Sequence, residues 1–361
     1  MKENDKSLVV VLGMHRSGTS VIARGLQVMG VDLGDHLMPP YEGNNSKGFW
    51  EDVDINTLNI EMLHSLKIDW HFLTPIQPAD VDALCANGYL QRAVELLREK
   101  TAAVNIFGFK NPRVAKLLRF WKEVFSHARM NAGYIIVIRH PLSVCSSLAK
   151  RDGFDFEKTY LLWLEHVISS LVGTEGENRV LVDYDTFMQT PEAELTRIAK
   201  ELQLSINAEE LQHFQLEFLD PGLQHTIYQL DDLLRDSAAP PLVQDVYSAL
   251  LRFTAGNEPP EESVLDDKIK QWDQEFSRMR STLVFVDKLG IKISAIAGAR
   301  NALKAERKAL LQEKEEMTQA FIVKEQAVQK LQAELLAIHQ SRWWRWSQAL
   351  RKLFRRFQPP Q

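Results

Sequence analysis

The chain has 361 residues, 25% of them charged and 45% hydrophobic, and its formal net charge at pH 7 is -5. This composition is that of a globular protein with a full core, and it argues against a nucleic-acid partner. The two cysteines, Cys85 and Cys145, form neither a disulfide framework nor a metal-ligand pattern, which fits a reducing compartment. Because no apolar run is longer than a strand, we expect a soluble, cytoplasmic protein.

Short apolar runs alternate with segments of helical periodicity over the first two thirds of the chain. Such runs are typical of buried parallel strands. The predicted strands are 8–12, 104–109, 134–138 and 180–182. The predicted helices are 17–30, 55–66, 81–100, 114–125, one from 142, 155–171 and 191–202. This alternation predicts an α/β fold with a P-loop-type parallel sheet flanked by helices, and a ligand site at the carboxyl ends of the strands.

The last third of the chain has a different pattern. Residues 239–241 and 257–260 are linker-like, and 261–340 are almost wholly helix-forming, with interior breaks at Gly290 and Gly298. One heptad position holds Leu303, Leu310, Met317, Leu331 and Ile338, interrupted by Lys324. Its partner position holds Phe321, Val328 and Leu335, but Arg307 and Lys314 occupy it earlier. The repeat predicts a coiled-coil extension and a homodimer, although a solvated single helix is also compatible with it.

The final segment, 341–361, contains three tryptophans, six basic residues and no acidic residue. A cationic, aromatic amphipathic helix suits the headgroup layer of an anionic membrane. We therefore expect 342–357 to contact the inner face of a membrane, with a partner-binding helix or a nucleic-acid contact as alternatives. The expected domains are 1–260, 261–340 and 341–361.

Residues 13–20 read GMHRSGTS and lie between the first predicted strand and the first predicted helix. Glycines allow a tight loop with inward N–H groups, and the helix dipole adds positive potential, so the loop is expected to hold phosphate or sulfonate oxygens. The spacing is similar to a Walker A loop, but Thr19 stands in place of its lysine, and Arg16 is the fixed cation. The alternative is a glycine turn that binds nothing.

The loop HRSGTS resembles the 5′-phosphosulfate loop of PAPS-dependent sulfotransferases. Residues 134–150, YIIVIRHPLSVCSSLAK, are similar to the second signature of that family. There, an arginine at a strand end and a serine eight residues later hold the 3′-phosphate of PAPS, and both groups are suited to a dianion. The resemblance implies that the donor contacts are made by His15, Arg16, Ser17, Gly18, Thr19, Ser20, Arg139 and Ser147.

Three further segments resemble family motifs in the expected order, and the resemblance extends over residues 7–205. They are GFWEDVDINTLN at 48–59, FGFKNPR at 107–113 and VLVDYDTFMQTP at 180–191. Asn111 stands where the family usually has Asp. The resemblance implies transfer of a sulfuryl group from PAPS to a hydroxyl, without a bound metal. Asp183 imitates a Walker B acid, and we interpret it as structural or as orienting a neighbour.

Sulfuryl transfer requires stabilisation of charge on the leaving oxygen and a base for the acceptor hydroxyl. We expect Arg16 to stabilise the leaving group, and Lys110 either to assist it or to hold the acceptor. Glu51 is the favoured base, because it follows a Gly-Phe-Trp loop directed at the strand ends. Capping of the next helix is the alternative role for Glu51. The competing bases are Asp52, Asp54 and His15.

The expected acceptor is a carbohydrate, either a polysaccharide or a glycolipid, because the motifs look bacterial and the tail suits a membrane. Its pocket is expected from the loops 32–47 and 219–234, and the second of these contains His225. Two other functions remain open. One is a nucleoside or sugar kinase with an atypical P-loop, which the missing lysine disfavours. The other is a non-catalytic coiled-coil membrane adaptor.

Overall fold

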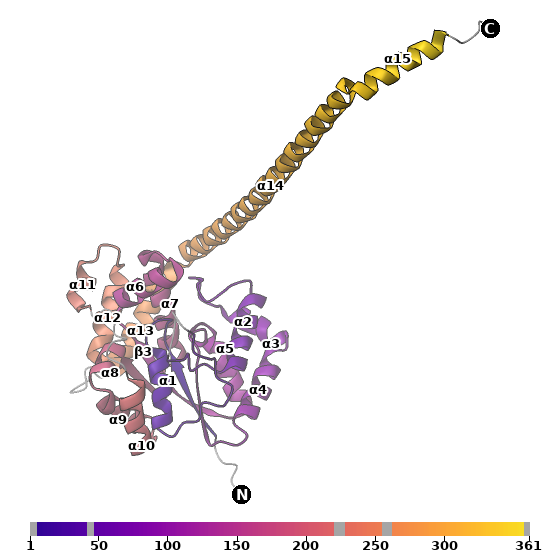
Figure 1. Ribbon diagram of the computed structural model, residues 1–361. Helices are drawn as coiled ribbons and strands as arrows, with labels where there is room; N and C mark the ends of the chain where they lie inside the picture. Colours follow the sequence, from indigo (N-terminus) through magenta and orange to yellow (C-terminus); the bar gives the residue numbers. More distant parts are fainter. Residues whose placement is uncertain (1–5, 42–46, 220–227, 255–261, 357–361) are drawn as a thin grey trace. The chain divides into compact units, whose positions relative to one another are not determined.

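The computed structural model describes residues 6–41, 47–219, 228–254 and 262–356 (Figure 1). Contacts between residues divide the chain into two units, Met1–Asp287 and Lys288–Gln361. The expected domain boundary at residue 260 lies outside the described residues. The first unit continues past it and includes α13 (Glu262–Arg278) and the start of α14 (Arg280–Gln340).

The first unit is built on a sheet whose described strands are all parallel, in the order β2-β1-β3-β4. These strands are β1 (Ser7–Leu12), β2 (Ile106–Lys110), β3 (Asn131–Ile138) and β4 (Arg179–Asp183). Val11 lies opposite Lys110 on one side and Ile135 on the other, so the three strands end at one edge of the sheet. The predicted α/β class with a parallel sheet is confirmed.

Helices cover both faces of the sheet. Successive side chains of a strand point to opposite faces, and those of β1 are apolar on both, so each face needs a cover. Val9 and Val11 belong to a smaller core, which includes side chains of α1 (Thr19–Val28), α8 (Tyr184–Gln189), α9 (Pro191–Glu201) and the π-helix η1 (Phe214–Phe218), and against which α10 (Ala208–His213) packs. Val10 and Leu12 belong to a larger core. Its helices include α2 (Val53–Ser65), α5 (Val114–Ala128), α6 (Pro141–Asp152), α7 (Phe156–Gly173), α11 (Leu230–Arg235), α12 (Pro241–Thr254) and α13.

Two helix predictions are wrong at glycines. The segment 81–100 forms two helices, α3 (Pro78–Ala86) and α4 (Tyr89–Lys100), because Gly88 between them has a left-handed φ of 85°. Conversely, α14 continues through Gly290 and Gly298, where breaks were predicted. A glycine in an exposed helix costs only about 1 kcal/mol relative to alanine, which a long helix tolerates.

The sequence pattern also missed α12 and α8. Pro241 suggested a linker, but it is the first residue of α12, where a proline loses no helical hydrogen bond. Val243, Val246 and Leu250 of this helix are completely buried. The region after residue 240 therefore contributes to the core of the first unit rather than linking it to a separate domain.

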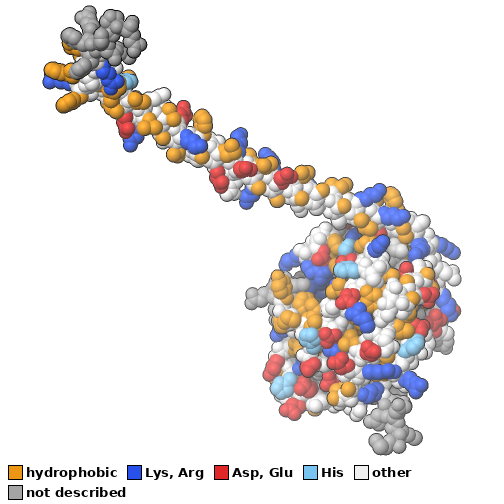
Figure 2. Space-filling view, turned by 90° about the vertical axis from the view of Figure 1, so that its right-hand side faces the viewer, with side chains coloured by type: hydrophobic (Ala, Val, Ile, Leu, Met, Phe, Trp, Pro, Cys, Tyr) orange, Lys and Arg blue, Asp and Glu red, His pale blue; other side chains and the backbone are white. Residues whose placement is uncertain are grey.

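The described part of the second unit consists of the remainder of α14 and of α15 (Arg342–Arg356). Figure 2 shows hydrophobic side chains along α14 interspersed with charged ones. The predicted heptad residues are exposed, with Leu303, Leu310 and Met317 at 65%, 57% and 68%. Among the described helices, none is long and apolar enough to cross a membrane.

Candidate active site

A cavity of about 680 Å³ lies at the carboxyl ends of the strands, where the sheet order predicts a ligand site. Its size is that of a small-molecule site. Among the described residues, its wall has two acidic side chains, Glu51 and Asp152, against a larger set of cations. The cations are Arg16, Lys47, Lys110, Arg113, Arg139 and Arg151. Such a wall favours a ligand with several negative charges.

The loop between β1 and α1 requires glycine at two positions. Gly13 and Gly18 have φ values of 153° and 83°. A Cβ on Gly18 would also come within 1.9 Å of a ring carbon of Tyr184. Gly18 precedes α1 and supplies no side-chain cap to its first turn. The N–H groups of that turn, together with the positive end of the helix dipole, therefore favour an anion.

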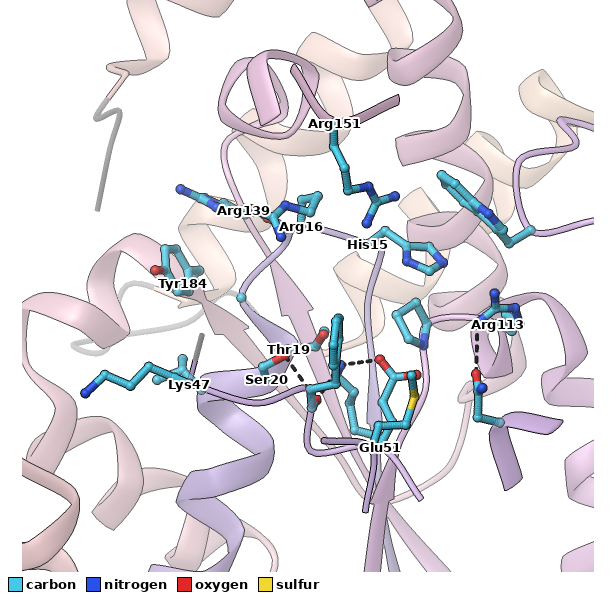
Figure 3. A pocket seen from close by; sticks show the side chains of 18 of the residues that line it. His15, Arg16, Thr19, Ser20, Lys47, Glu51, Arg113, Arg139, Arg151 and Tyr184 are labelled. Atoms are coloured by element: carbon cyan, nitrogen blue, oxygen red, sulfur yellow. Dashed lines mark hydrogen bonds and ion pairs between the residues drawn. The ribbon is translucent and has the colours of Figure 1, made fainter. Parts of the chain in front are cut away.

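Arg16 connects this loop to α6. Its Nε donates to Ser147 Oγ at 2.7 Å, and its carbonyl oxygen accepts from Nη1 of Arg139 at 2.9 Å. The Arg139 guanidinium lies 4.5 Å from the centre of the Tyr184 ring, a cation–π distance. Figure 3 shows Arg16, Arg139 and Tyr184 near one another. The two segments predicted to hold the donor phosphates are therefore adjacent in the structure.

His140 positions the start of α6. Its Nδ1 accepts from the Leu142 N–H at 3.2 Å, and its Nε2 lies 3.1 Å from the carbonyl oxygen of Gln229. Both contacts are satisfied by one neutral tautomer, with the proton on Nε2. Burial lowers the pKa of His140, in agreement with that neutral state. This cap fixes the helix that carries Ser147.

Glu51 is buried, with 6% of its surface exposed, and both of its carboxylate oxygens have partners. Oε1 accepts from Lys110 Nζ at 2.7 Å, and Oε2 accepts from Asn111 Nδ2 at 2.6 Å. Lys110 also donates to the carbonyl oxygen of Phe49 at 3.0 Å. Each carboxylate oxygen has a second lone pair, so Glu51 can still meet an acceptor hydroxyl. The motif residues after β2 thus position the favoured base.

The neighbouring carboxylates have structural contacts instead. Asp52 caps α2, since its side chain accepts from the backbone N–H groups of Asp54 and Ile55. Asp52 and Asp54 also lie 2.8 Å and 2.6 Å from Lys100 Nζ. Neither aspartate lines the cavity. The capping role that was an alternative for Glu51 therefore belongs to Asp52.

His15 packs on Trp70, with ring centroids 4.2 Å apart, and its buried Nε2 has no hydrogen-bond partner within the described ranges of the chain. Burial lowers the pKa of His15 well below 6.5, and nearby positive charges add to this effect. The added charges are those of Arg113, His166, Arg151 and Lys110. His15 is therefore neutral near pH 7, so it can accept a proton but contributes no cation to the donor site.

Most of the predicted site residues line the cavity. These are His15, Arg16, Gly18, Thr19, Ser20, Glu51, Lys110 and Arg139. Ser17 and Ser147 do not line it. Ser17 is buried, and its N–H donates to the Met14 carbonyl at 3.2 Å, whereas Ser147 accepts from Arg16. The donor-binding and catalytic roles of these residues stay predictions.

Sequence reasoning did not single out several residues of the cavity wall: Trp70, Arg113, Arg151 and Tyr184. Arg113 ends the FGFKNPR segment, and Arg151 follows Ser147 by one helical turn, so both had a signal in the sequence. Asp183, the Walker B-like acid, instead caps α8 by accepting from the N–H and hydroxyl of Thr186. Burial raises the pKa of Asp183 to about 6.

A buried ionic cluster supports the cavity wall from behind. Glu165 Oε2 lies 2.8 Å from Lys116 Nζ and 3.0 Å from His166 Nδ1, and these side chains are inaccessible to solvent. Lys116 also donates to the Phe72 carbonyl at 2.8 Å. The cluster thus joins α5, α7 and the segment after α2 that carries Trp70.

A comparison with known protein families identifies the family of this chain. The model of the sulfotransferase family matches residues 9–208, more than half of the chain. The chain therefore belongs to the sulfotransferase family, and it is an enzyme of that class rather than a kinase or a non-catalytic adaptor. The family assignment also supports PAPS, the donor that the sequence predicted.

Among solved structures, the chain is similar to the sulfotransferase domain from the curacin biosynthetic pathway, with 16% identity and a TM-score of 0.36, over 75% of this chain and 98% of that one. The sulfotransferase domain from the Synechococcus PCC 7002 olefin synthase has 14% identity and a TM-score of 0.35, over 77% and 97%. Retinol dehydratase in complex with androsterone and the inactive cofactor PAP has 13% identity and a TM-score of 0.28, over 78% of this chain and 80% of that one. No curated protein matches the chain. Because these TM-scores are low, the assignment rests on the family match.

Proposed function

We propose that this sulfotransferase moves a sulfuryl group from PAPS to a hydroxyl group of a carbohydrate acceptor, in the cytoplasm at the inner face of a membrane. The observation that carries the donor assignment is the 2.7 Å hydrogen bond between Arg16 and Ser147. It joins the loop suited to a 5′-phosphosulfate to the Arg139–Ser147 pair suited to a 3′-phosphate. A donor with anionic groups at both ends of its ribose matches this arrangement.

In the proposed reaction, the acceptor oxygen forms a bond to sulfur while the bond from sulfur to the bridging oxygen of PAPS breaks. Such a transfer has a loose transition state, so the protein mainly positions the groups and balances charge. Arg16 stabilises the negative charge that develops on the departing PAP. Glu51 takes the proton of the acceptor hydroxyl, and Lys110 holds Glu51 in place at 2.7 Å.

Calorimetric titration tests the donor assignment. We expect PAP to bind tightly in the absence of metal, and ATP with Mg²⁺ to bind at least about tenfold more weakly, a difference of about 1.4 kcal/mol. The Arg139→Gln variant should bind PAP at least about tenfold more weakly, because a charge-assisted contact to phosphate is lost. An exposed arginine of α4, Arg92, provides the control as Arg92→Gln. A preference for ATP with Mg²⁺ would contradict the assignment.

A carbohydrate acceptor is proposed because the motifs resemble those of bacterial sulfotransferases and because the basic, aromatic tail suits a membrane surface. The loops expected to form its pocket are described only in part, because 42–46 and 220–227 lie outside the described residues. His225 is among them. Phe218 and Leu219 do line the cavity, as do Met38 and Lys47. Both loops thus contribute side chains where an acceptor would enter.

Membrane contact is proposed through α15. Trp343 and Trp346 are 87% and 71% exposed, and basic side chains lie on the same helix. Burial of exposed aromatic rings at a lipid interface, together with attraction to anionic headgroups, favours binding. Flotation with phosphatidylserine-containing liposomes should carry the full chain, whereas a chain ending at Ile338 should stay at the bottom of the gradient. Equal flotation of the two chains would reject the membrane role.

A homodimer is proposed through the coiled-coil pattern of α14. Phe321, Val328 and Leu335 are 67%, 52% and 55% exposed, and they follow the heptad spacing of the sequence. Pairing of two such helices would bury these side chains. Light scattering should give twice the chain mass of 41.4 kDa for the full protein. A monomeric mass at micromolar concentration would exclude the dimer.

A further inference from the structure

The cavity has a second cationic wall beyond the proposed donor site. It is formed by Arg113, Arg151 and Trp70, which all line the cavity. Figure 3 shows Arg113 and Arg151 around His15, and Tyr184 farther from it. The charges of both arginines lower the pKa of His15, in agreement with their closeness to that ring. Arg151 also lowers the pKa of Arg16, so it faces both sides of the cavity. Arg113 lies on the other side of His15 from Tyr184 and is therefore separate from the Arg139–Tyr184 contact (Figure 3).

Arg113 differs from the other cations near this end of the cavity. Lys110 is paired with Glu51 at 2.7 Å, and Arg151 with Asp152 at 2.7 Å. In the part of the chain that the structure describes, no carboxylate lies within 4.0 Å of the Arg113 guanidinium. Its Nη1 donates to Asn56 Oδ1 at 3.0 Å, and its buried Nε has no hydrogen-bond partner.

An arginine in this position is unfavourable for the protein alone. Removing a guanidinium from water costs free energy, and burial lowers the pKa of Arg113. The charges of Glu51 and Asp69 act in the opposite direction, but neither carboxylate is within ion-pair distance of the guanidinium. The cost is offset when an anion binds, because the planar fork of donors matches a carboxylate or a phosphate. Arg151 adds a second positive charge to the same wall. Its guanidinium lies 5.4 Å from the centre of the Trp70 ring, which also lines the cavity.

We propose that the acceptor is an anionic hydroxyl compound and that Arg113 binds its carboxylate or phosphate group. The inference rests on the proposed function, because it assumes that PAPS occupies the side of the cavity with Arg16 and Arg139. A neutral sugar would leave the Arg113 guanidinium without a direct ionic partner in the ternary complex. An acceptor with an acidic group near its reactive hydroxyl satisfies this charge and places the hydroxyl on the cavity side of Glu51.

Binding to the full-length protein saturated with PAP tests the proposal. The probes are cellobiose, its uronic acid and its 6-phosphate, which separate a neutral sugar from two kinds of anion. We expect at least one anionic probe to bind about tenfold or more tightly than cellobiose. The Arg113→Gln variant should lose this advantage, whereas Arg113→Lys should keep part of it. Arg119→Gln changes an exposed arginine of α5, the helix that begins directly after Arg113, and should keep all of this advantage.

The affinity for PAP shows whether each variant retains a folded donor site, and we expect it to stay within about twofold of the wild-type value. Equal affinity for all three probes, no binding of either anionic probe, or an anionic preference that survives Arg113→Gln would overturn the inference. A wild-type protein that does not bind PAP would instead contradict the proposed function. The two failures are thus distinguishable in the same experiment.

Discussion

The turnover number of the Glu51→Gln variant is expected to be at least about a hundredfold lower than that of the wild type, because a general base typically contributes about that much or more. Glutamine has nearly the same shape, but its amide cannot take the proton of the acceptor hydroxyl. Its amide nitrogen, Nε2, would also face the donor group of Lys110 or Asn111, which in the wild type donate to the Glu51 carboxylate at 2.7 Å and 2.6 Å. Steady-state kinetics, with calorimetry to show that PAP binding is kept, provide the measurement.

Two variants make this result specific. Asp54→Asn changes a carboxylate that lies outside the cavity and pairs with Lys100, so its turnover should stay near the wild-type value. His15→Asn removes the neutral imidazole that lines the cavity. Near-normal turnover of Glu51→Gln, combined with a large loss in His15→Asn, would assign the base to His15 instead.

The Glu165→Gln variant is expected to lower the free energy of unfolding by about 3–5 kcal/mol, because it leaves Lys116 buried without its counter-ion. Burial opposes ionisation of Glu165, but Lys116 and His166 hold its pKa below the usual value of 4.5. This contribution to stability is present above pH 4.5 and is lost as the pH falls through the lower folded-state pKa. Urea denaturation near pH 7 and at low pH measures both effects.

An exposed ion pair provides the matched control. Glu177 lies 2.7 Å from Lys122, with both side chains more than a third exposed, so Glu177→Gln should cost less than about 1 kcal/mol. The double variant Lys116→Met with Glu165→Leu removes both charges and should recover most of the loss. Equal stability of the wild type and Glu165→Gln would show that the buried pair contributes nothing.

The donor side of the cavity could be predicted from the sequence because local patterns specify it. An apolar run predicts β1, glycines allow the loop, and the helix that begins at Thr19 supplies an anion-binding terminus. Arg139 and Ser147 follow the same logic, since they lie at a strand end and on the next helix. Parallel strands bring all these ends to one edge of the sheet without further information.

The position of Trp70 on the other wall could not be predicted, because contacts between distant parts of the chain determine it. Trp70 lies in an irregular segment with no periodic pattern. That segment is held by Asp287, whose carboxylate accepts from the N–H groups of Leu73 and Thr74 at 2.8 Å and 2.9 Å. A sequence separation of more than 200 residues leaves no local signal of this contact. The position of Arg151 over Trp70 depends on it in turn.

The role of Asp287 also sets where the chain can be cut or recombined. Trp272, Phe276 and Leu283 are 2% exposed or less, so a break at residue 260 would strip them from the core and would release the segment that carries Trp70. A break after Asp287 touches none of these contacts. In a gene fusion, the segment from Lys288 onward can therefore be replaced without loss of these core contacts. Residues of α13 and the first turns of α14 must stay joined to the catalytic unit.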